Sequence, residues 1–313
     1  MESLVLATKV VFPLVVYMIV GWIIRKKEIM EKEHFKRINA MVFKVILPIG
    51  IFFDIYETDL GEVFQPKVFL FVAIGTIVVF AISWIIISRM VKNNADASVM
   101  IQGIYRSNYA LFGVTIAKAI CDAEGIALAA ALTAIVIPVF NVLAVVLFET
   151  KRGGEVKFTR VFLNILKNPL IVASISGGAA ALHGITIPEI LSQPLIKLGD
   201  TASPLALVAL GGMLSVGSVI KHRKYLFVVV LGKLVLTPGI MLAAAALMGM
   251  RGSVLVALLS VFGSPTAVSS APMAQTMGGN GELAGEIVAI TSVCCILTVF
   301  LFVFGMSQMG LIW

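Results

Sequence analysis

Residues 103–113 read Gly-Ile-Tyr-Arg-Ser-Asn-Tyr-Ala-Leu-Phe-Gly, and they place arginine, serine and asparagine side by side within the apolar segment 97–118. A second apolar segment, 252–277, contains Gly-Ser-Pro-Thr-Ala-Val-Ser-Ser-Ala-Pro at residues 263–272. Each of the two prolines in it removes a hydrogen bond from a helix. Within a bilayer, backbone groups freed in this way must be satisfied by protein or by a water-filled cavity. We therefore predict a broken helix in each segment.

The composition of the whole chain is that of a membrane protein. Of its 313 residues, 59% are hydrophobic and 13% are charged, against about 45–50% and about 25% in soluble domains. This excludes a soluble enzyme and, because one span takes about 20 apolar residues, leaves no room for a separate soluble domain. The sequence predicts ten spans, at residues 4–24, 36–56, 67–90, 97–118, 124–148, 161–183, 194–219, 225–248, 252–277 and 283–308.

The basic residues indicate how these spans are oriented. Most of the 24 Lys and Arg residues lie in the connections after the first, third, fifth and seventh spans. Positively charged connections stay in the cytoplasm, so we expect a multi-pass protein of the cytoplasmic membrane with both termini outside. The net charge of +7 is then a sign of topology, and we expect no nucleic acid as a partner.

The three cysteines indicate neither a disulfide framework nor a zinc site. Cys294 and Cys295 are adjacent, and neither they nor Cys121 has a metal-ligand spacing with a histidine. We therefore expect no metal and no cofactor, apart from Na⁺ or H⁺ as a coupling ion.

The two halves of the chain match at one fixed offset of 156 residues, the separation of Pro13 from Pro169. Two proline matches at one offset, in a chain with only 11 prolines, make chance the weaker explanation. The matched pairs include Pro13 with Pro169, Gly21 with Gly177, Pro48 with Pro204, and Asn108 with Ser264.

Each half contains five spans, so the second half must enter the membrane from the opposite side. Inverted repeats of this kind are typical of secondary transporters, whose substrate site lies where the repeats meet. We predict a first repeat at residues 1–150, a cytoplasmic linker at 151–160 and a second repeat at 161–313. The equivalent breaks should cross near the centre; the alternative is a simple kink in each helix, with hydroxyl groups bonded to the preceding turn.

Several short motifs resemble those of one family. They are Arg106-Ser107-Asn108-Tyr109 followed by Gly113, Pro265-Thr266-Ala267, the run Gly278 to Ser292, and Pro204-Leu205-Ala206-Leu207 with Gly211 and Gly212. In combination, over nearly the whole chain, they resemble the auxin efflux carrier family, which includes bacterial malate/malonate-type permeases related to the plant PIN-type auxin carriers.

The resemblance implies an all-α membrane protein of ten transmembrane helices in two inverted five-helix repeats, with broken crossover helices 4 and 9, a fold like that of the bile-acid sodium symporters. It also implies a scaffold domain and a transport domain that move against each other. Members of the family carry organic anions. By the same resemblance Asn108 contacts substrate and Pro265 is the crossover proline of span nine. The chain departs from the family pattern at Thr115, where many relatives have proline, and in its short central connection, Glu149 to Arg160. Substrate identity therefore does not carry over from the auxin carriers.

Ionisable residues inside the predicted spans are costly and by default suggest function. Arg106 lies beside the first break. Lys197 and Asp200 are three apart on a helix and can form an ion pair, unless Asp200 takes a proton during transport. Lys233 has no local partner, so snorkelling and a role in the lumen both stay open. The others are Lys44 and, near span ends where a side chain can reach the interface, Asp54, Lys167 and Glu286.

We expect a secondary transporter and not an enzyme. A small carboxylate such as malate, malonate or an auxin-like acid binds at the crossover, and the transport domain then exposes it on the other side of the membrane. Basic residues outnumber acidic ones at depth, which favours an anion. The expected partners are this anion and the lipid bilayer, with a homodimer left open. The predicted substrate-binding residues are Asn108, Arg106, Tyr109, Ser264, Pro265, Thr266 and Ser269, and the coupling or ion-pair candidates are Lys197, Asp200, Lys233 and Glu286.

Three other functions stay open. An intramembrane aspartyl protease would use Asp54 and Asp200, because paired carboxylates can share a proton and activate water, although no protease motif accompanies them. A channel usually builds its filter from several subunits. A sodium-coupled symporter of the bile-acid type would need oxygen ligands near the crossover, for which the candidates are Glu282, Glu286, Gln275 and Asn108.

Overall fold

The computed structural model describes residues 2–58, 64–109, 116–117, 120–152, 163, 166–214 and 216–312. Gly113, Thr115 and residues 153–160 of the predicted linker lie outside the described residues. Within the described part, the chain is helical and contains no strand beyond one isolated bridge.

The helices of the two halves follow one another in a similar order. The first half forms α1 (Glu2–Lys26), α2 (Lys32–Met41), the π-helical turn η1 (Val42–Ile46), α3 (Leu47–Tyr56), α4 (Pro66–Met90), α5 (Asn94–Tyr105) and α7 (Ala123–Lys151). The second half forms α9 (Pro169–Leu182), α10 (Glu189–Asp200), α11 (Ala202–Met213), α12 (Val216–Lys221), α13 (Arg223–Leu231), the π-helical turn η3 (Gly232–Leu236), α14 (Thr237–Leu247), α15 (Ser253–Gly263), α16 (Ser270–Met277) and α17 (Gly281–Gln308).

Apolar helices of membrane-spanning length confirm the prediction of a helical membrane protein. Within the described ranges, five helices are long and apolar enough to cross a membrane, by length and composition: Lys32–Tyr56, Pro66–Met90, Ala123–Lys151, Arg223–Leu247 and Gly281–Gln308. Two further apolar helices, α9 and α15, are shorter.

Helix ends fall where the sequence predicts broken spans. In segment 97–118, α5 ends at Tyr105. In segment 252–277, α15 ends at Gly263, and α16 begins only at Ser270. The chain between these two helices is therefore not helical.

The predicted span at 194–219 is also divided, although no break is predicted there from the sequence. It is shared between α10, α11 and α12, with the first junction at Thr201. Pro204 then lies in the first turn of α11, where a missing N–H costs little because the first four N–H groups of a helix have no partner inside it.

Side-chain caps determine where several helices begin. Asp122 accepts a hydrogen bond from the Gly125 amide at the start of α7, over 2.9 Å. Asn280 accepts one from the Leu283 amide at the start of α17, over 3.1 Å. Such caps satisfy amides that would otherwise lack a partner.

Two pairs of helices cross at glycines, and each pair joins a helix of the first half to a helix of the second. α1 packs along α11 and α3 packs along α9. A methyl group on Gly21 would lie 1.9 Å from the carbonyl oxygen of Val208, and one on Gly177 would lie 2.5 Å from that of Phe52. Residue 177 is 156 beyond 21 and residue 208 is 156 beyond 52. The same close approach therefore recurs at the offset that relates the two halves.

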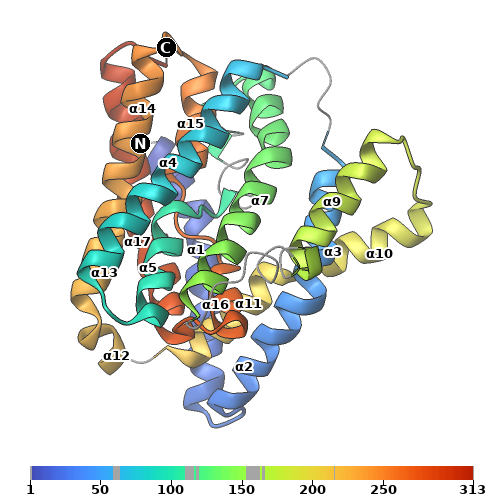
Figure 1. Ribbon diagram of the computed structural model, residues 1–313, viewed down its shortest axis with the longest axis vertical. Helices are drawn as coiled ribbons and strands as arrows, with labels where there is room; N and C mark the ends of the chain where they lie inside the picture. The colour runs from blue at the N-terminus through green and yellow to red at the C-terminus, as the bar shows by residue number, and fades with distance from the viewer. Residues whose placement is uncertain are drawn as a thin grey trace.

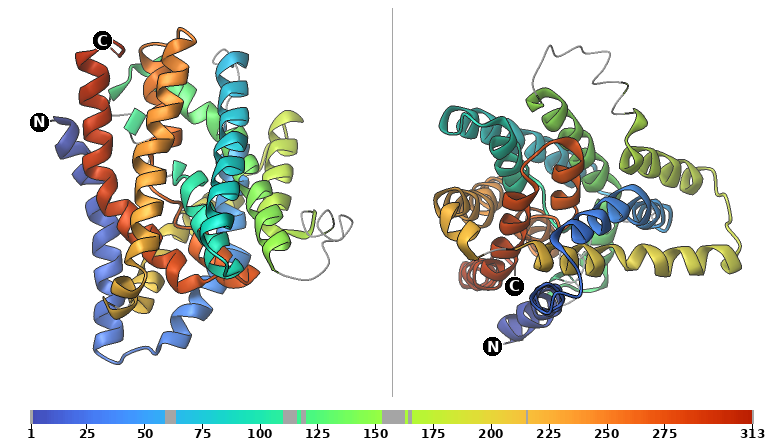
Figure 2. Two further views of the ribbon diagram at one scale, coloured as in Figure 1. Left: turned by 60° about the vertical axis from the view of Figure 1, so that its left-hand side comes forward. Right: turned by 90° about the horizontal axis from the view of Figure 1, so that it is seen from below.

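The helices form two groups with α7 between them. In Figure 1, α9 and α10 lie at one side of the molecule, and α13, α14 and α17 lie at the other. The start of α1 and the end of α17 lie toward the same end of the molecule in both side views (Figures 1 and 2). The end of α5 lies between the groups, packed on α7.

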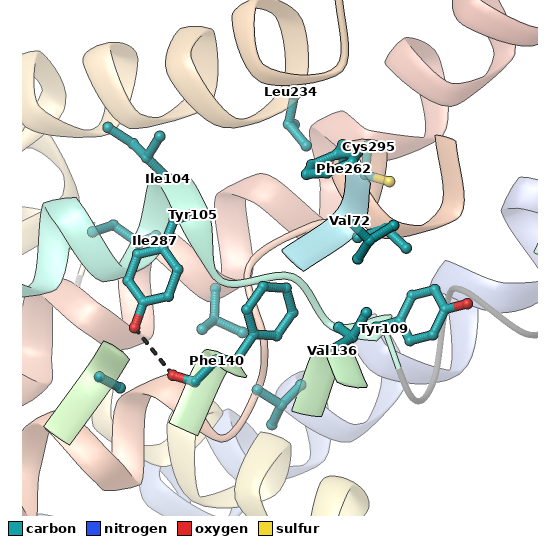
Figure 3. Packing of buried hydrophobic residues seen from close by; sticks show 14 of the residues in the cluster. Val72, Ile104, Tyr105, Tyr109, Val136, Phe140, Leu234, Phe262, Ile287 and Cys295 are labelled. Carbon is teal, nitrogen blue, oxygen red and sulfur yellow. Dashed lines mark hydrogen bonds between the residues drawn. The ribbon is translucent and has the colours of Figure 1, made fainter. Parts of the chain in front are cut away.

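Buried aromatic side chains fix the chain where it leaves α5. Tyr105 and Tyr109 point in opposite directions from the extended segment that joins them (Figure 3). The Tyr105 hydroxyl donates to the backbone carbonyl of Phe140 in α7, over 3.3 Å. The Tyr109 hydroxyl donates to the carbonyl of Ala129, also in α7. These contacts hold both ends of the extended segment against one helix.

Candidate functional site

The two helix breaks meet as short extended segments that pass each other. Ser107 and Thr266 form an antiparallel β-bridge. The Asn108 amide donates to the carbonyl of Pro265 over 2.7 Å, and the Ala267 amide donates to the carbonyl of Arg106 over 3.3 Å. The segments expected to cross are therefore hydrogen-bonded to each other in the interior of the protein.

Hydroxyl groups at the crossover satisfy the freed helix ends. The Thr266 hydroxyl donates to the carbonyl of Gly103 over 2.7 Å, and the Ser264 hydroxyl donates to that of Ser260 over 2.5 Å. Neither residue lines the cavity described below, and neither does Pro265. Three of the predicted substrate-binding residues thus hold the crossover together and do not face the cavity.

Arg106 is the buried positive charge of the site. Arg106 as a whole is only 3% exposed. One terminal nitrogen, Nη2, donates to Asn141 Oδ1 over 2.8 Å and to Ser269 Oγ over 3.0 Å, and Nη1 lies 2.9 Å from the sulfur of Met273. All three partners are neutral. Among the described residues, no acidic side chain forms an ion pair with Arg106.

A cavity of about 220 Å³ opens beside the crossover. The crossover residues that line it are Arg106, Ser107, Asn108, Tyr109, Ala267, Val268 and Ser269. The rest of its wall comes from α7, through Ile137, Phe140 and Asn141, and from α3 and the α10–α11 junction, through Leu47, Gly50, Ile51, Asp54, Gly199, Asp200, Ala202, Ser203 and Ala206. Four of the seven predicted substrate-binding residues, Arg106, Asn108, Tyr109 and Ser269, are thus gathered at one cavity.

Three N–H donors of the lining residues have no partner among the described residues. They are Arg106 Nε, Asn108 Nδ2 and Asn141 Nδ2, and each is buried. A buried donor without an acceptor costs about 1–3 kcal/mol. A ligand with several acceptor oxygens, such as a carboxylate, would remove that cost and would also neutralise Arg106.

Asp54 and Asp200 line the part of the wall made by α3 and α10. From the sequence, Asp54 near a span end is expected to reach the interface, whereas in the structure it lines the cavity. Asp200 does not pair with Lys197, because neither residue forms an ion pair within the described part of the chain. The cavity wall therefore carries a basic residue at the crossover and two acidic residues on α3 and α10.

The other coupling candidates lie away from the cavity wall. Glu286 is fully buried, and its Oε2 lies 2.8 Å from Nδ1 of His222. Lys233 is fully buried and donates to the hydroxyl of Ser107. Lys197 is exposed. Of the four candidates, only Asp200 lines the cavity.

The residues proposed for a sodium site are not gathered with Asn108. Glu282 pairs with Lys32 over 3.1 Å. Gln275 donates to the backbone carbonyl of Lys36 and accepts from Asn39. Within the described residues no group of three or more His, Cys, Asp or Glu side chains could hold a metal ion.

Asn141 is a residue of the cavity wall that was not predicted from the sequence. It lies in α7, is fully buried and accepts the hydrogen bond from Arg106. The signal that could have found it is the one used for Asn108, an amide in the middle of an apolar span.

Comparison with known proteins identifies the family. The family model described as membrane transport protein matches residues 6–303, nearly the whole chain. No match was found among curated proteins. The resemblance noted in the crossover motifs is thus confirmed at the level of the family. The chain belongs to the membrane transport protein family, which is that of the auxin efflux carriers and PIN-like permeases.

Proposed function

We propose that this membrane transporter is a secondary carrier of a small organic anion, a carboxylate such as malate, malonate or an auxin-like acid. The observation that carries the proposal is the state of Arg106, a buried cation with only neutral partners at the edge of a cavity. A buried charge is normally paired. The substrate carboxylate would supply the missing partner, with Asn108 and Asn141 as further donors.

The proposed architecture is that of ten spans in two inverted five-span repeats, at residues 1–150 and 161–313, joined by a cytoplasmic linker. Three observations support it. The crossover brings together two equivalent breaks, the glycine crossings recur at the offset of 156 residues (from 21 to 177), and the start of α1 and the end of α17 lie toward the same end of the molecule. With the basic connections in the cytoplasm, both termini would lie outside the cytoplasmic membrane.

Alternating access would occur between the two walls of the cavity. One wall is made by α3, α10 and α11, and the other by the crossover and α7. Movement of one wall against the other would open the cavity first to one side and then to the other, as in other carriers built from repeats. A scaffold domain and a transport domain would each contain helices of both repeats, because α1 packs on α11 and α3 packs on α9.

Asp54 and Asp200 are the coupling groups in this proposal. Two carboxylates facing one cavity with Arg106 would repel a bound anion if both were charged. Protonation of one of them would relieve the repulsion, so that a proton would accompany the anion.

The same pair of acids is the one observation that favours a protease, since both line one cavity. Membership of a transporter family favours the coupling role. Cleavage of a transmembrane peptide that stops in Asp54→Asn and Asp200→Asn would support the protease.

The test of the proposed function is carboxylate binding and uptake by purified protein in liposomes. Arg106→Gln removes a charged donor, which is worth about 1.5–3 kcal/mol, so affinity should fall about 10- to 150-fold. Asn108→Ala should abolish saturable uptake of malate or malonate. Asn39→Ala is the matched control, because Asn39 is a fully buried asparagine that does not line the cavity.

Wild-type affinity in both Arg106→Gln and Asn108→Ala would overturn the assignment of the site. Uptake that does not saturate, together with ohmic conductance, would overturn the carrier in favour of a channel.

A further inference from the structure

Lys233 reaches the crossover from behind the cavity. It lies in η3, is fully buried and does not line the cavity. Its ammonium group donates to the hydroxyl of Ser107, the residue that forms the β-bridge with Thr266. The Ser107 hydroxyl donates in turn to the carbonyl of Val261 near the end of α15. Lys233 is thus hydrogen-bonded to the extended segment that follows α5. The Ser107 hydroxyl connects it to the end of α15.

The charge of Lys233 is not balanced by an acid. None of the ion pairs found among the described residues includes it. The helices packed on η3 are α5, α13, α14, α15 and α17. Glu286, the fully buried acid of α17, is paired with His222. The structure therefore keeps a lysine in its interior without a counter-ion.

Two half-helices end at the crossover that Lys233 contacts. α5 ends at Tyr105 and α15 ends at Gly263, and both carboxyl ends meet at the crossover. A helix C-terminus carries about half a negative charge, because its last carbonyl groups are unpaired. Two such ends repel each other, and a nearby cation relieves the repulsion.

We propose that Lys233 is a built-in cation that holds the two half-helix ends of the crossover together. It is a positioning residue, because it acts on the substrate through Ser107 and the crossover. Its effect on anion affinity rests on the proposed function, and its effect on the stability of the crossover does not.

The experiment removes the charge of Lys233 and then restores it. Lys233→Met keeps most of the volume without the ammonium, and anion affinity should fall at least tenfold in a folded protein. Lys233→Ala leaves a space that matches n-propylammonium, so millimolar n-propylammonium should raise its melting temperature and restore affinity. The neutral analogue n-propanol should do neither. Lys44→Ala is the control, because Lys44 is an exposed lysine in another π-helical turn, η1.

Unchanged affinity in Lys233→Met, or equal rescue by n-propanol, would overturn the role of the charge. If the wild-type protein binds no organic anion, the proposed function fails while the rescue of the melting temperature still decides the role of Lys233 at the crossover. Ser107→Ala keeps the ammonium group of Lys233 but removes the hydroxyl that joins it to Val261. This variant should have a lower melting temperature that does not respond to n-propylammonium.

Discussion

Replacing Gly21 or Gly177 by alanine should separate helices that touch through their backbones. The new methyl group on residue 21 would lie 1.9 Å from the Val208 carbonyl oxygen, and that on residue 177 would lie 2.5 Å from the Phe52 carbonyl oxygen. Ordinary contact begins at 3.4 Å. α1 and α11 would therefore have to move apart by about 1.5 Å, and α9 and α3 by about 0.9 Å, because a backbone carbonyl cannot rotate out of the way.

Each substitution changes the free energy of unfolding in two opposite ways. Overpacking costs about 1–3 kcal/mol and occasionally more, while alanine in place of glycine within a helix gains up to about 1 kcal/mol. For Gly177→Ala we expect a net loss of about 1 kcal/mol. For Gly21→Ala, with the larger displacement, we expect a loss of about 2 kcal/mol or more.

Gly305→Ala is the matched control, because Gly305 lies in α17 and a methyl group there would meet nothing within 4 Å. It should raise stability by about 0.5–1 kcal/mol. The assay is the melting temperature of each purified variant in one detergent. The expected order is Gly305→Ala, wild type, Gly177→Ala, Gly21→Ala, from most to least stable. If Gly21→Ala and Gly177→Ala melt at or above the wild-type temperature, the close backbone crossings, and with them this support for the repeat, are wrong.

Two further predictions concern residues near the site and away from it. Tyr109→Phe should lower stability by about 1 kcal/mol, because its hydroxyl donates to Ala129 in α7, yet anion affinity should stay within twofold; a tenfold loss in a binding assay would show that the hydroxyl contacts substrate. Glu286→Ala should cost about 3 kcal/mol or more, because it leaves one partner of a buried pair alone, whereas Glu282→Ala, in a half-exposed pair with Lys32, should cost less than about 1 kcal/mol; equal melting temperatures of the two variants would contradict this.

The sequence was informative about the crossover because a helix break is a local property. Arginine, serine and asparagine in one apolar segment, and two prolines in another, deprive the backbone of helical hydrogen bonds wherever the segments lie. The structure accordingly ends α5 at Tyr105 and interrupts the ninth segment between Gly263 and Ser270. The offset of 156 residues (from 13 to 169) was equally available from the chain alone, since it needs only a comparison of residue types.

The direction of each polar side chain could not be predicted in the same way. Ser264 and Ser269 are both hydroxyl residues of one broken segment, yet Ser264 bonds its own helix while Ser269 lines the cavity. In an irregular segment there is no period from which to assign a face. The direction is set by the antiparallel bridge to the other segment.

By itself, the sequence determined that the protein lies in a membrane, where two of its spans break and which residues carry charge into them. Only the tertiary structure decided which of those residues share a cavity. Asp54, Asp200 and Asn141 join Arg106 and Asn108 there, while Lys233 is bonded to the back of the crossover. Breaking a helix depends on the hydrogen bonds of neighbouring residues, but gathering a site depends on how helices far apart in the chain pack against one another.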